Sequence, residues 1–391
     1  MLALNPVVLL IILYLFVNFL TMVLGCMNDG VKVETTFFKI SAESLVYSFI
    51  LQVSCLLFLY VLYRLFYKKI SHNDLTLGNS WGAVLFIIQF TFALFNYKMG
   101  INTAGSTERI EGGSFTNYLF ILLQPDNIAI IISLCLKSPF LFWLNIVAYT
   151  FSMLLRGWMS GIFIIFFLIL SRYPYAKISL KSFIRLFFCL LILLAVMPAI
   201  IEAKWAMRTG VSALSFISGI PSYFTIDRYS MGTDYLLNRF QHVGHLALIL
   251  DNSSALYREY SENKFSGYYW EGLPQIVISK LLNIEVNKVT TYLVGYFFNI
   301  PNPSWNINVG LVGWLFILRG ESVFFVFYIL AILCLPYYIV SKYAGKKLLN
   351  ILSCFSIVFL FHGWLGAYVN LAIYACLISL LANTKIYIRS S

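Results

Sequence analysis

The sequence predicts an all-α polytopic membrane protein with about ten transmembrane helices and one large loop outside the membrane. Of the 391 residues, 60% are hydrophobic and 11% are charged, whereas a soluble domain carries about 25% charged residues. The mean hydropathy is +0.83. Apolar runs of roughly 17 to 25 residues, long enough to cross the hydrocarbon core, recur in both halves of the chain. Backbone groups in lipid must bond internally and the runs do not alternate as barrel strands do, so we expect helices.

The chain divides into three parts. Residues 1–201 hold helices one to seven, residues 202–308 form the large loop, and residues 309–391 hold helices eight to ten. The first apolar run has no charged start and no cleavage site of a signal peptide, so we expect it to be retained as a span. The predicted spans are 4–24, 44–63, 81–97, 116–136, 139–155, 160–171, 183–201, 309–340, 348–361 and 366–383.

The distribution of charge orients these helices. The net charge of +11 is concentrated in segments on one side of the predicted spans, where Asp74 is the only acid. The positive-inside rule therefore places both termini in the cytoplasm and the loop 202–308 on the outer face, and the surplus charge requires no nucleic-acid partner. The basic residues of the predicted cytoplasmic segments are Arg64, Lys68, Lys69, Lys137, Arg172, Lys177, Lys181, Arg185, Lys342, Lys346, Lys347, Lys385 and Arg389.

Polar residues interrupt two of the predicted spans. In the fourth span, Pro125 should break or kink the helix, and Asp126 lies at membrane depth. Such an acid either has a function or pairs with an arginine of a neighbouring helix. In the eighth span, Arg319 and Glu321 follow a short apolar run. We expect residues 309–340 to form one broken crossing, with a re-entrant first half as the variant.

Most of the chemically versatile residues fall in the loop. Residues 235–247 have apolar positions at helical spacing, which puts His242 and His245 on one face of a predicted helix with Arg239 one turn earlier. A cap at 251–255 predicts a second short helix.

Further along the loop, residues 273–282 predict an amphipathic helix at the membrane interface. Where the chain re-enters the membrane, Asn308, Gly310 and Gly313 predict close approach of backbones.

The residue types exclude several classes of chemistry. The chain has no Walker loop, no dinucleotide fingerprint and no closely spaced pair of acids. Its seven cysteines lie in or beside apolar runs and form neither a disulfide framework nor a metal-binding pattern. We therefore expect no cofactor and no metal.

Arginines, histidines and aromatic rings remain, and these suit a phosphorylated lipid that carries a sugar. Guanidinium groups match pyrophosphate oxygens. A transferase that uses such a donor needs cations for the departing pyrophosphate and a base with a pKa near 7 for the acceptor hydroxyl.

Four segments resemble the Wzy-type O-antigen polymerases of bacterial surface polysaccharide assembly. The overall layout, with many spans and one dominant outer loop late in the chain, is also similar. Where that family often has a basic residue after a proline, this chain has Gln275 after Pro274, and Lys280 is the nearest cation. The four segments are LLRGWMSG (Leu154 to Gly161), LLNRFQHVGHLALI (Leu236 to Ile249), GLPQIVISKLL (Gly272 to Leu282) and NINVGLVGW (Asn306 to Trp314).

The resemblance implies a metal-independent glycosyltransferase of the bacterial inner membrane that acts on the periplasmic side. It would transfer a growing glycan from one undecaprenyl pyrophosphate carrier onto a single carrier-linked repeat unit. A chain-length regulator in the same membrane is a candidate partner. On this hypothesis Arg228 and Arg239 bind the donor pyrophosphate, Arg156 assists, and His242 or His245 is the base.

The same hypothesis gives the remaining candidate residues to substrate binding. Tyr268, Tyr269 and Trp270 would stack on sugar, and Arg258 and Lys280 are further cations of the loop.

Two alternatives remain. An O-antigen ligase has a similar layout and donor but passes the glycan to a lipid A core. A flippase or transporter of lipid-linked sugars would explain Asp126, the broken helices and His362 at an outer helix end. Against a transporter, the chain lacks an inverted repeat, and most of its polar residues lie in one outer loop and not at the bilayer midplane.

Overall fold

The computed structural model describes a protein built almost entirely of helices. The predicted outer loop at 98–114 lies largely outside the described residues, as does the C-terminal segment after 382, and the predicted seventh span at 183–201 is described in part. The described residues are 5–34, 36–70, 74–101, 115–158, 160–173, 188, 191–192, 194–203, 206, 213–300, 303 and 305–382.

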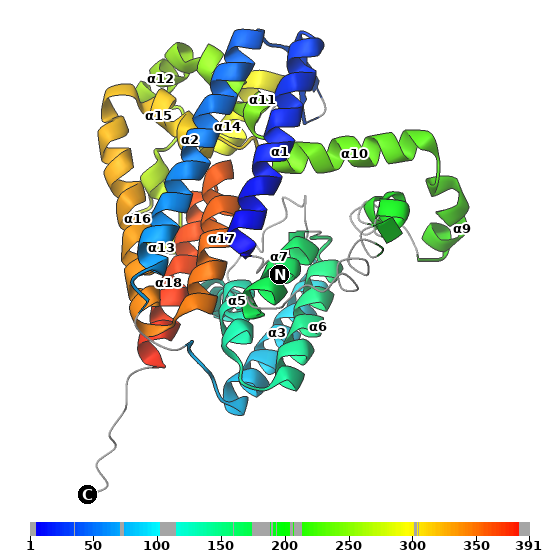
Figure 1. The fold of residues 1–391 in the computed structure, drawn as a ribbon, viewed down its shortest axis with the longest axis vertical. Coiled ribbons are helices and arrows are strands. Elements are labelled where there is room, and N and C mark those ends of the chain that lie inside the picture. The colour runs from blue at the N-terminus through cyan, green and yellow to red at the C-terminus, as the bar shows by residue number, and fades with distance from the viewer. Residues whose placement is uncertain are drawn as a thin grey trace, which may run out of the picture.

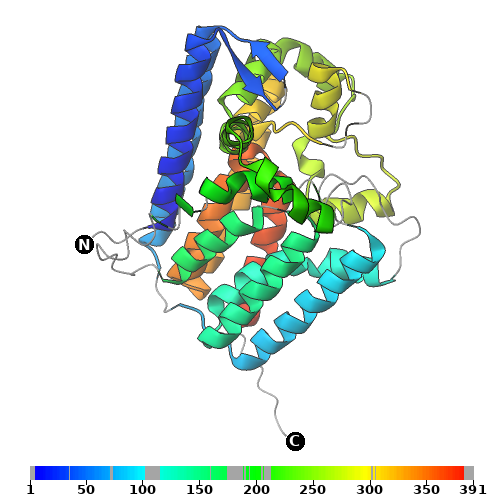
Figure 2. The same ribbon diagram turned by 90° about the vertical axis from the view of Figure 1, so that its right-hand side faces the viewer.

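Two long helices at the N-terminus stand side by side (Figure 1). They are α1 (Pro6–Met27) and α2 (Ala42–Tyr67). The side chain of Asn5 caps α1 by accepting from Val7 N and Val8 N. A hairpin of β1 (Gly30–Val33) and β2 (Thr36–Lys39) joins the two helices at one end (Figure 2). This hairpin was not predicted from the sequence, although apolar and polar residues alternate over Val31, Lys32 and Val33 of β1.

The second group of helices lies beside and below the first (Figure 1). As Pro125 predicted, the chain bends by 43° between α4 and α5. The proline stands at the start of α5, and Gln124 before it has a positive φ of 45°. This group consists of α3 (Asn79–Met99), α4 (Phe115–Leu123), α5 (Pro125–Cys135), α6 (Pro139–Leu155) and α7 (Ser160–Arg172).

The three C-terminal helices are α16 (Ser322–Tyr343), α17 (Lys346–His362) and α18 (Leu365–Leu381). Among the three, α17 is the most buried. Most side chains of α17 are buried, because it packs against α1, α2, α5, α7, α15, α16 and α18. Any site at the end of α17 is therefore held from several sides.

The stretch before α16 turns sharply. It consists of α15 (Gly310–Leu318) and the short helix η2 (Arg319–Glu321). The ring centroids of Trp314 and Phe325 are 6.3 Å apart, whereas eleven residues of straight helix would span about 16 Å. The chain thus folds back at η2, where Arg319 has a φ of 48°. The broken crossing and its re-entrant variant both remain predictions.

The segment between the two membrane parts is helical and packs against its neighbours. From one end of this segment, α10 runs across the direction of α1, with α9 beyond it (Figure 1). Apolar residues of α11, α12 and α14 belong to the same hydrophobic core as those of α16 and α17, whereas α13 buries none of its residues. The apolar helix Leu194–Ala203, in the second half of the predicted seventh span, precedes this segment. The helices of the segment are α9 (Ala213–Tyr223), α10 (Ile226–Phe240), α11 (Val243–Asp251), α12 (Ser253–Ser261), η1 (Tyr268–Trp270), α13 (Leu273–Leu281) and α14 (Val289–Phe298).

Two of the helices predicted in the loop are present and a third is divided. One further helix was not predicted. The helices predicted from 251–260 and 273–282 correspond to α12 and α13. The single helix predicted over 235–247 is wrong, because α10 ends at Phe240 and α11 begins at Val243. No helix was predicted over 289–298, where the structure has α14.

The apolar helices identify a membrane-embedded protein. Among the described residues, four helices are long and apolar enough to cross a membrane, and the bent pair α4–α5 makes a fifth. One of the four is the stretch Gly310–Tyr343, which passes by length and composition although it turns at η2. The ten crossings and the sides of the membrane remain predictions.

Candidate functional site

The candidate site is built around the break between α10 and α11. One side chain of α1 holds both helix ends. The carboxamide of Asn18 donates to the carbonyl of Phe240 at 3.1 Å. Its oxygen accepts from the amide groups of His242 at 2.8 Å and Val243 at 3.2 Å. These bonds satisfy backbone groups that a helix break would otherwise leave unpaired, so the chain turns here and not one residue away.

His242 is fixed by both of its ring nitrogens. Its Nε2 lies 3.0 Å from the carbonyl oxygen of Asn308, and a carbonyl can only accept, so Nε2 carries the proton. Its Nδ1 then accepts from the side-chain amide of Gln52 at 2.8 Å. Burial, followed by the neighbouring His245 and His362, lowers the pKa of His242 well below its usual value. The imidazole is therefore neutral and fully hydrogen-bonded.

Two more histidines complete a buried cluster. The rings of His242 and His245 stack with centroids 5.3 Å apart, and His362 lies 5.6 Å from His242. None of the three is more than 3% exposed. The Nε2 of His362 lies 3.0 Å from the hydroxyl of Tyr14 on α1. We call His242, His245 and His362 the histidine core.

The ring nitrogens of His245 have no hydrogen-bond partner among the described residues. A carboxylate oxygen of Glu34, in the turn of the β-hairpin, lies 3.8 Å from its Nε2. Because Glu34 is 20% exposed, this pair connects the histidine core to the surface. Of the two histidines predicted as the base, His245 is therefore the one whose ring nitrogens accept or donate no hydrogen bond among the described residues.

Two glycines let the backbones meet beneath His242, as predicted for Gly310. Gly310 and Gly363 have positive φ angles of 72° and 80°. A Cβ atom on Gly310 would lie 2.5 Å from the ring of His242, and one on Gly363 would lie 2.5 Å from the nitrogen of Gly310. The indole of Trp364 donates to the side chain of Asn308 at 2.7 Å. The ends of α15, α17 and α18 therefore converge on the histidine core.

The histidine core lies partway along the long helices. At the N-terminal end of α1, Asn5 donates to the hydroxyl of Tyr63 at 2.8 Å, and Tyr63 donates to Asn350 at 2.9 Å. These bonds tie together one end of α1, α2 and α17. From there Asn18 is about 20 Å along α1, whose full length is about 33 Å. The histidine core is thus nearer the end that carries the hairpin.

Arg239 is the cation closest in sequence to the histidine core. It is exposed near the end of α10, and its guanidinium lies 4.9 Å from the ring of Tyr235. The next residue, Phe240, packs its ring against Tyr14 with centroids 5.8 Å apart. Among the described residues no carboxylate forms an ion pair with Arg239, so its charge is available to an anion.

The other predicted arginines are placed differently. Arg156 is 4% exposed and forms a bidentate pair with Asp126, at 2.8 and 2.9 Å. This is the pairing that the sequence left open for Asp126. Arg228 pairs with Glu202. Arg258 is exposed on α12, which lies well apart from α10 in Figure 1. Arg258 therefore does not share a site with Arg239.

The predicted aromatic cluster divides between core and surface. Tyr268 is buried, with ring centroids 4.8 Å from Phe325 and 6.0 Å from Trp314. Tyr269 is 48% exposed and Trp270 is half-buried. Of the three, Tyr269 presents the most accessible ring.

The predicted cation after the proline of α13 is also on the surface. Lys280 is exposed, and its Nζ lies 5.2 Å from the ring centroid of Tyr118 on α4. This contact places Lys280 beside α4 and gives no link to the histidine core.

Several residues of the site were not singled out from the sequence. Asn18 and Gln52 lie in apolar helices, and polar residues at such positions are a recognised signal of function. No feature of the sequence singled out Tyr14.

Glu271 is half-buried and accepts from the amide of Gly366 at 3.3 Å at the start of α18. Burial raises the pKa of Glu271 to about 7.

The comparisons leave the chemistry to be argued from these residues. The chain matches no protein-family model, no curated protein and no solved structure. Within the part of the chain that the structure describes, no three His, Cys, Asp or Glu side chains are arranged to hold a metal ion.

Proposed function

We propose that this protein is a surface-polysaccharide polymerase of the bacterial inner membrane. It would transfer a glycan from undecaprenyl pyrophosphate onto a second carrier-linked repeat unit on the periplasmic face, without a metal or cofactor. The observation that supports this most directly is that Arg239 is exposed beside the histidine core of a membrane-embedded protein and forms no ion pair with a carboxylate among the described residues. A lipid-linked donor carries a pyrophosphate anion that an arginine can bind and a hydrophobic chain that can stay in the membrane.

Arg239 would bind the donor pyrophosphate and stabilise the charge that it gains as it leaves. Fixed cations aimed at developing charge are among the largest contributions to catalysis. Arg156 and Arg228 already have carboxylate partners, so they are weaker candidates for this role than the sequence implied. The hydrogen bonds of Asn18 and the packing of Phe240 against Tyr14 hold the helix end that carries Arg239.

The acceptor hydroxyl must lose a proton to a base. His242 cannot accept a proton without losing a hydrogen bond, because Gln52 donates to its Nδ1 and its Nε2 donates to Asn308. We therefore assign His242 to positioning and His245 to the base. Glu34 beside His245 would carry the proton towards the surface. Tyr269 would stack on a sugar of the acceptor.

Deletion of the gene tests the proposed function. A lipopolysaccharide gel of the deletion strain should show core plus a single repeat unit, because single units would still be exported and ligated. Loss of even the single repeat would instead indicate ligation or export, and the polymerase assignment would be wrong.

Complementation of that strain tests Arg239. The variant Arg239→Ala should lower chain elongation about 100-fold, the scale of losing one charge-stabilising donor. Arg64→Ala, on the predicted cytoplasmic side, is the matched control and should restore the ladder. A normal ladder with Arg239→Ala would exclude Arg239 from the donor site.

A further inference from the structure

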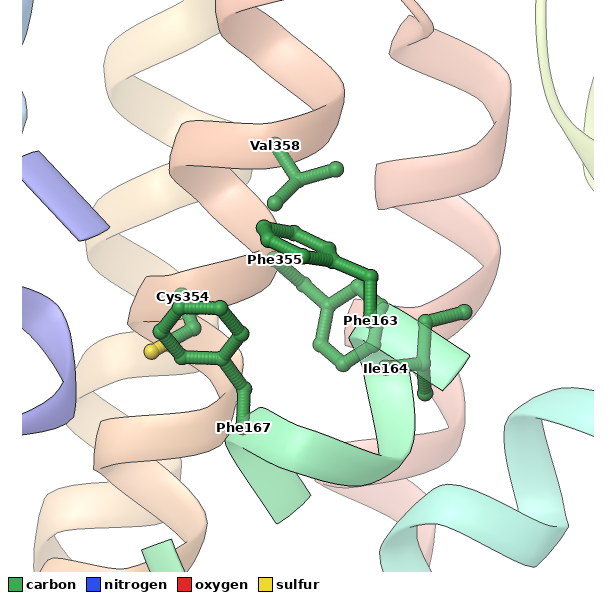
Figure 3. A pocket seen from close by; sticks show the side chains of 6 residues that line it. All are labelled: Phe163, Ile164, Phe167, Cys354, Phe355 and Val358. Atoms are coloured by element: carbon green, nitrogen blue, oxygen red, sulfur yellow. The ribbon is translucent and has the colours of Figure 1, made fainter. Parts of the chain in front are cut away.

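The gap between α7 and α17 cannot hold a substrate. Its lining is apolar, and side chains from the two helices face one another across it (Figure 3). Its cavity volume is about 10 Å³, which is about the minimum that one water molecule needs. A large hydrophilic substrate therefore requires an open surface, and the residues around η2 present one.

Five tyrosines of α12, η1 and α14 lie near η2. Tyr269 is 48% exposed and Tyr296 is 38% exposed, and the other three are half-buried. The rings of Tyr292 and Tyr296 stack with centroids 6.3 Å apart, and Tyr269 lies beside Tyr260. The ring of Phe265 joins the two sets, 5.8 Å from that of Tyr260 and 5.0 Å from that of Tyr292. We call Tyr257, Tyr260, Tyr269, Tyr292 and Tyr296 the tyrosine surface.

Carboxylates lie between these rings. The hydroxyl of Tyr292 donates to Glu259 at 2.5 Å, and that of Tyr260 donates to Glu321 at 3.3 Å. These bonds fix the orientation of both rings, so little side-chain freedom is lost when a ligand packs on them. A carboxylate has about four acceptor positions. Glu259 and Glu321 can therefore accept from further hydroxyl groups.

Arg319 adds donors to the same surface. It follows α15 at the sharp turn and is exposed, as is Glu321. Its guanidinium lies 5.1 Å from the ring centroid of Tyr257 and donates to the hydroxyl of Ser254. Because a guanidinium has several N–H groups, Arg319 retains donors for a ligand. The two charged residues that interrupt the predicted eighth span thus belong to an open polar surface.

By the predicted topology, the tyrosine surface lies at the outer end of the protein. Helix α16 begins directly after η2 and is 22 residues long, or about 33 Å. Its other end carries Lys342, followed by Lys346 and Lys347, which the positive-inside rule places in the cytoplasm. Helices α12 and α15 lie at the opposite end of α16 (Figure 1). Along α15, η2 is about 13 Å from Gly310, which lies beneath His242, so the surface lies outward of the histidine core.

The chemistry of the surface selects a sugar chain. Tyrosine rings offer apolar faces to the C–H faces of sugars, and sugar hydroxyl groups both donate and accept hydrogen bonds. The surface supplies rings beside carboxylate acceptors and guanidinium donors. A hydrocarbon chain would leave these polar groups unpaired. An anionic lipid head group would be repelled by Glu259 and Glu321.

We propose that the tyrosine surface binds the glycan that the enzyme extends and holds several of its sugars outward of the histidine core. This inference rests on the proposed function, which supplies a glycan on the donor carrier. Tyr269, assigned above to the acceptor sugar, belongs to the same surface, so the acceptor and the growing chain would lie side by side. The surface would retain the chain between additions and take no part in bond formation.

Glycan binding tests this inference. The full-length protein is placed in phosphatidylcholine nanodiscs with fluorescent O-polysaccharide, released from the strain's lipopolysaccharide by mild acid, and binding is followed by fluorescence polarisation. The wild type should bind. Inorganic pyrophosphate should not compete, because it would occupy Arg239. Failure of the wild type to bind, or displacement of the glycan by pyrophosphate or by phosphatidylglycerol vesicles, would overturn the inference.

A paired substitution locates the binding. Tyr269→Ala with Tyr296→Ala should weaken binding about tenfold, which corresponds to about 1.4 kcal/mol. Both side chains are exposed, so the protein should keep its fold. Tyr97→Ala with Tyr338→Ala is the matched control, since it removes two rings that are 72% and 51% exposed on α3 and α16, and it should bind as the wild type does. Equal binding by the two folded double variants would refute the inference.

Chain length gives an independent readout. In the complemented deletion strain, Tyr269→Ala with Tyr296→Ala should still polymerise but give shorter chains, whereas Arg239→Ala should lose elongation. A ladder of normal length from the tyrosine double variant would contradict retention of the chain by this surface.

The two proposals can fail separately. If the deletion strain loses its ladder but the folded tyrosine double variant binds glycan and elongates chains normally, the polymerase assignment stands and the tyrosine surface is not the glycan site. If glycan binding depends on these tyrosines but deletion leaves the ladder intact, the surface binds a glycan and the polymerase assignment is wrong.

Discussion

The side-chain amide of Gln52 donates a 2.8 Å hydrogen bond to Nδ1 of His242, across 190 residues of sequence. It joins the middle of α2 to the break between α10 and α11. Both side chains are almost fully buried, so neither can replace this bond with water. The bond also fixes the tautomer of His242, because the donor at Nδ1 leaves the proton on Nε2 for Asn308.

We expect Gln52→Leu to destabilise the protein by about 1–3 kcal/mol, the cost of an unpaired buried acceptor at Nδ1 of His242. Thermal unfolding of the purified protein in detergent measures this loss. Ser54→Ala is the matched control two residues along α2, since the exposed Ser54 bonds only within its own helix. Equal stability of the two variants would show that the contact with His242 contributes nothing.

Gly310→Ala should be more damaging than most changes from glycine to alanine. The added Cβ would lie 2.5 Å from the His242 ring and 2.9 Å from the carbonyl of Phe361, and the φ of 72° disfavours a side chain. We expect a loss of about 2–4 kcal/mol from overpacking and backbone strain, together with loss of chain elongation. Gly320→Ala, which would meet no atom within 4 Å, should leave stability nearly unchanged. A Gly310→Ala protein as stable as this control would contradict the close approach.

Arg156→Ala should destabilise the protein because it leaves the carboxylate of Asp126 without its partner. The pair is partly exposed at Asp126, so we expect about 1–3 kcal/mol and not the larger cost of a fully buried charge. The double change Asp126→Leu with Arg156→Leu should recover most of the loss. If this folded double variant still elongates chains, Arg156 has a structural role. Loss of elongation at normal stability would return Arg156 to the donor site.

Glu271 should make stability depend on pH. Burial raises the pKa of Glu271 from 4.5 to about 7, so the ionised carboxylate disfavours the folded state. This penalty is absent below pH 4.5, grows between pH 4.5 and 7, and is complete above pH 7. Lowering the pH from 8 to 5 should therefore stabilise the wild type by about 2 kcal/mol through this residue.

The variant Glu271→Gln isolates that contribution. Its unfolding temperature, followed by tryptophan fluorescence in detergent, should vary less between pH 8 and pH 5 than that of the wild type. Glu262→Gln, at an exposed position with a side chain 52% exposed, should keep the wild-type dependence. An unchanged pH profile in Glu271→Gln would show that this carboxyl does not couple to folding.

Much of the local structure followed from the sequence. Long apolar runs became α1, α2 and α3 because helices bond their own backbone wherever water is absent. Pro125 bent the chain as expected, and Pro274 stands at the start of α13. His242, His245 and Arg239 were singled out because polar residues near a membrane require a reason to be there.

Tertiary structure alone decided how these residues work. Helical periodicity over 235–247 predicted one helix, but Asn18, more than 200 residues earlier, captures the backbone at His242 and divides it. Burial of His242 and pairing of Arg156 with Asp126 likewise depend on partners distant in sequence. Local spacing sets which side chains share a helix face. The residues that packing brings together determine which histidine nitrogens are hydrogen-bonded and which arginines have a carboxylate partner. These two properties decide the chemistry.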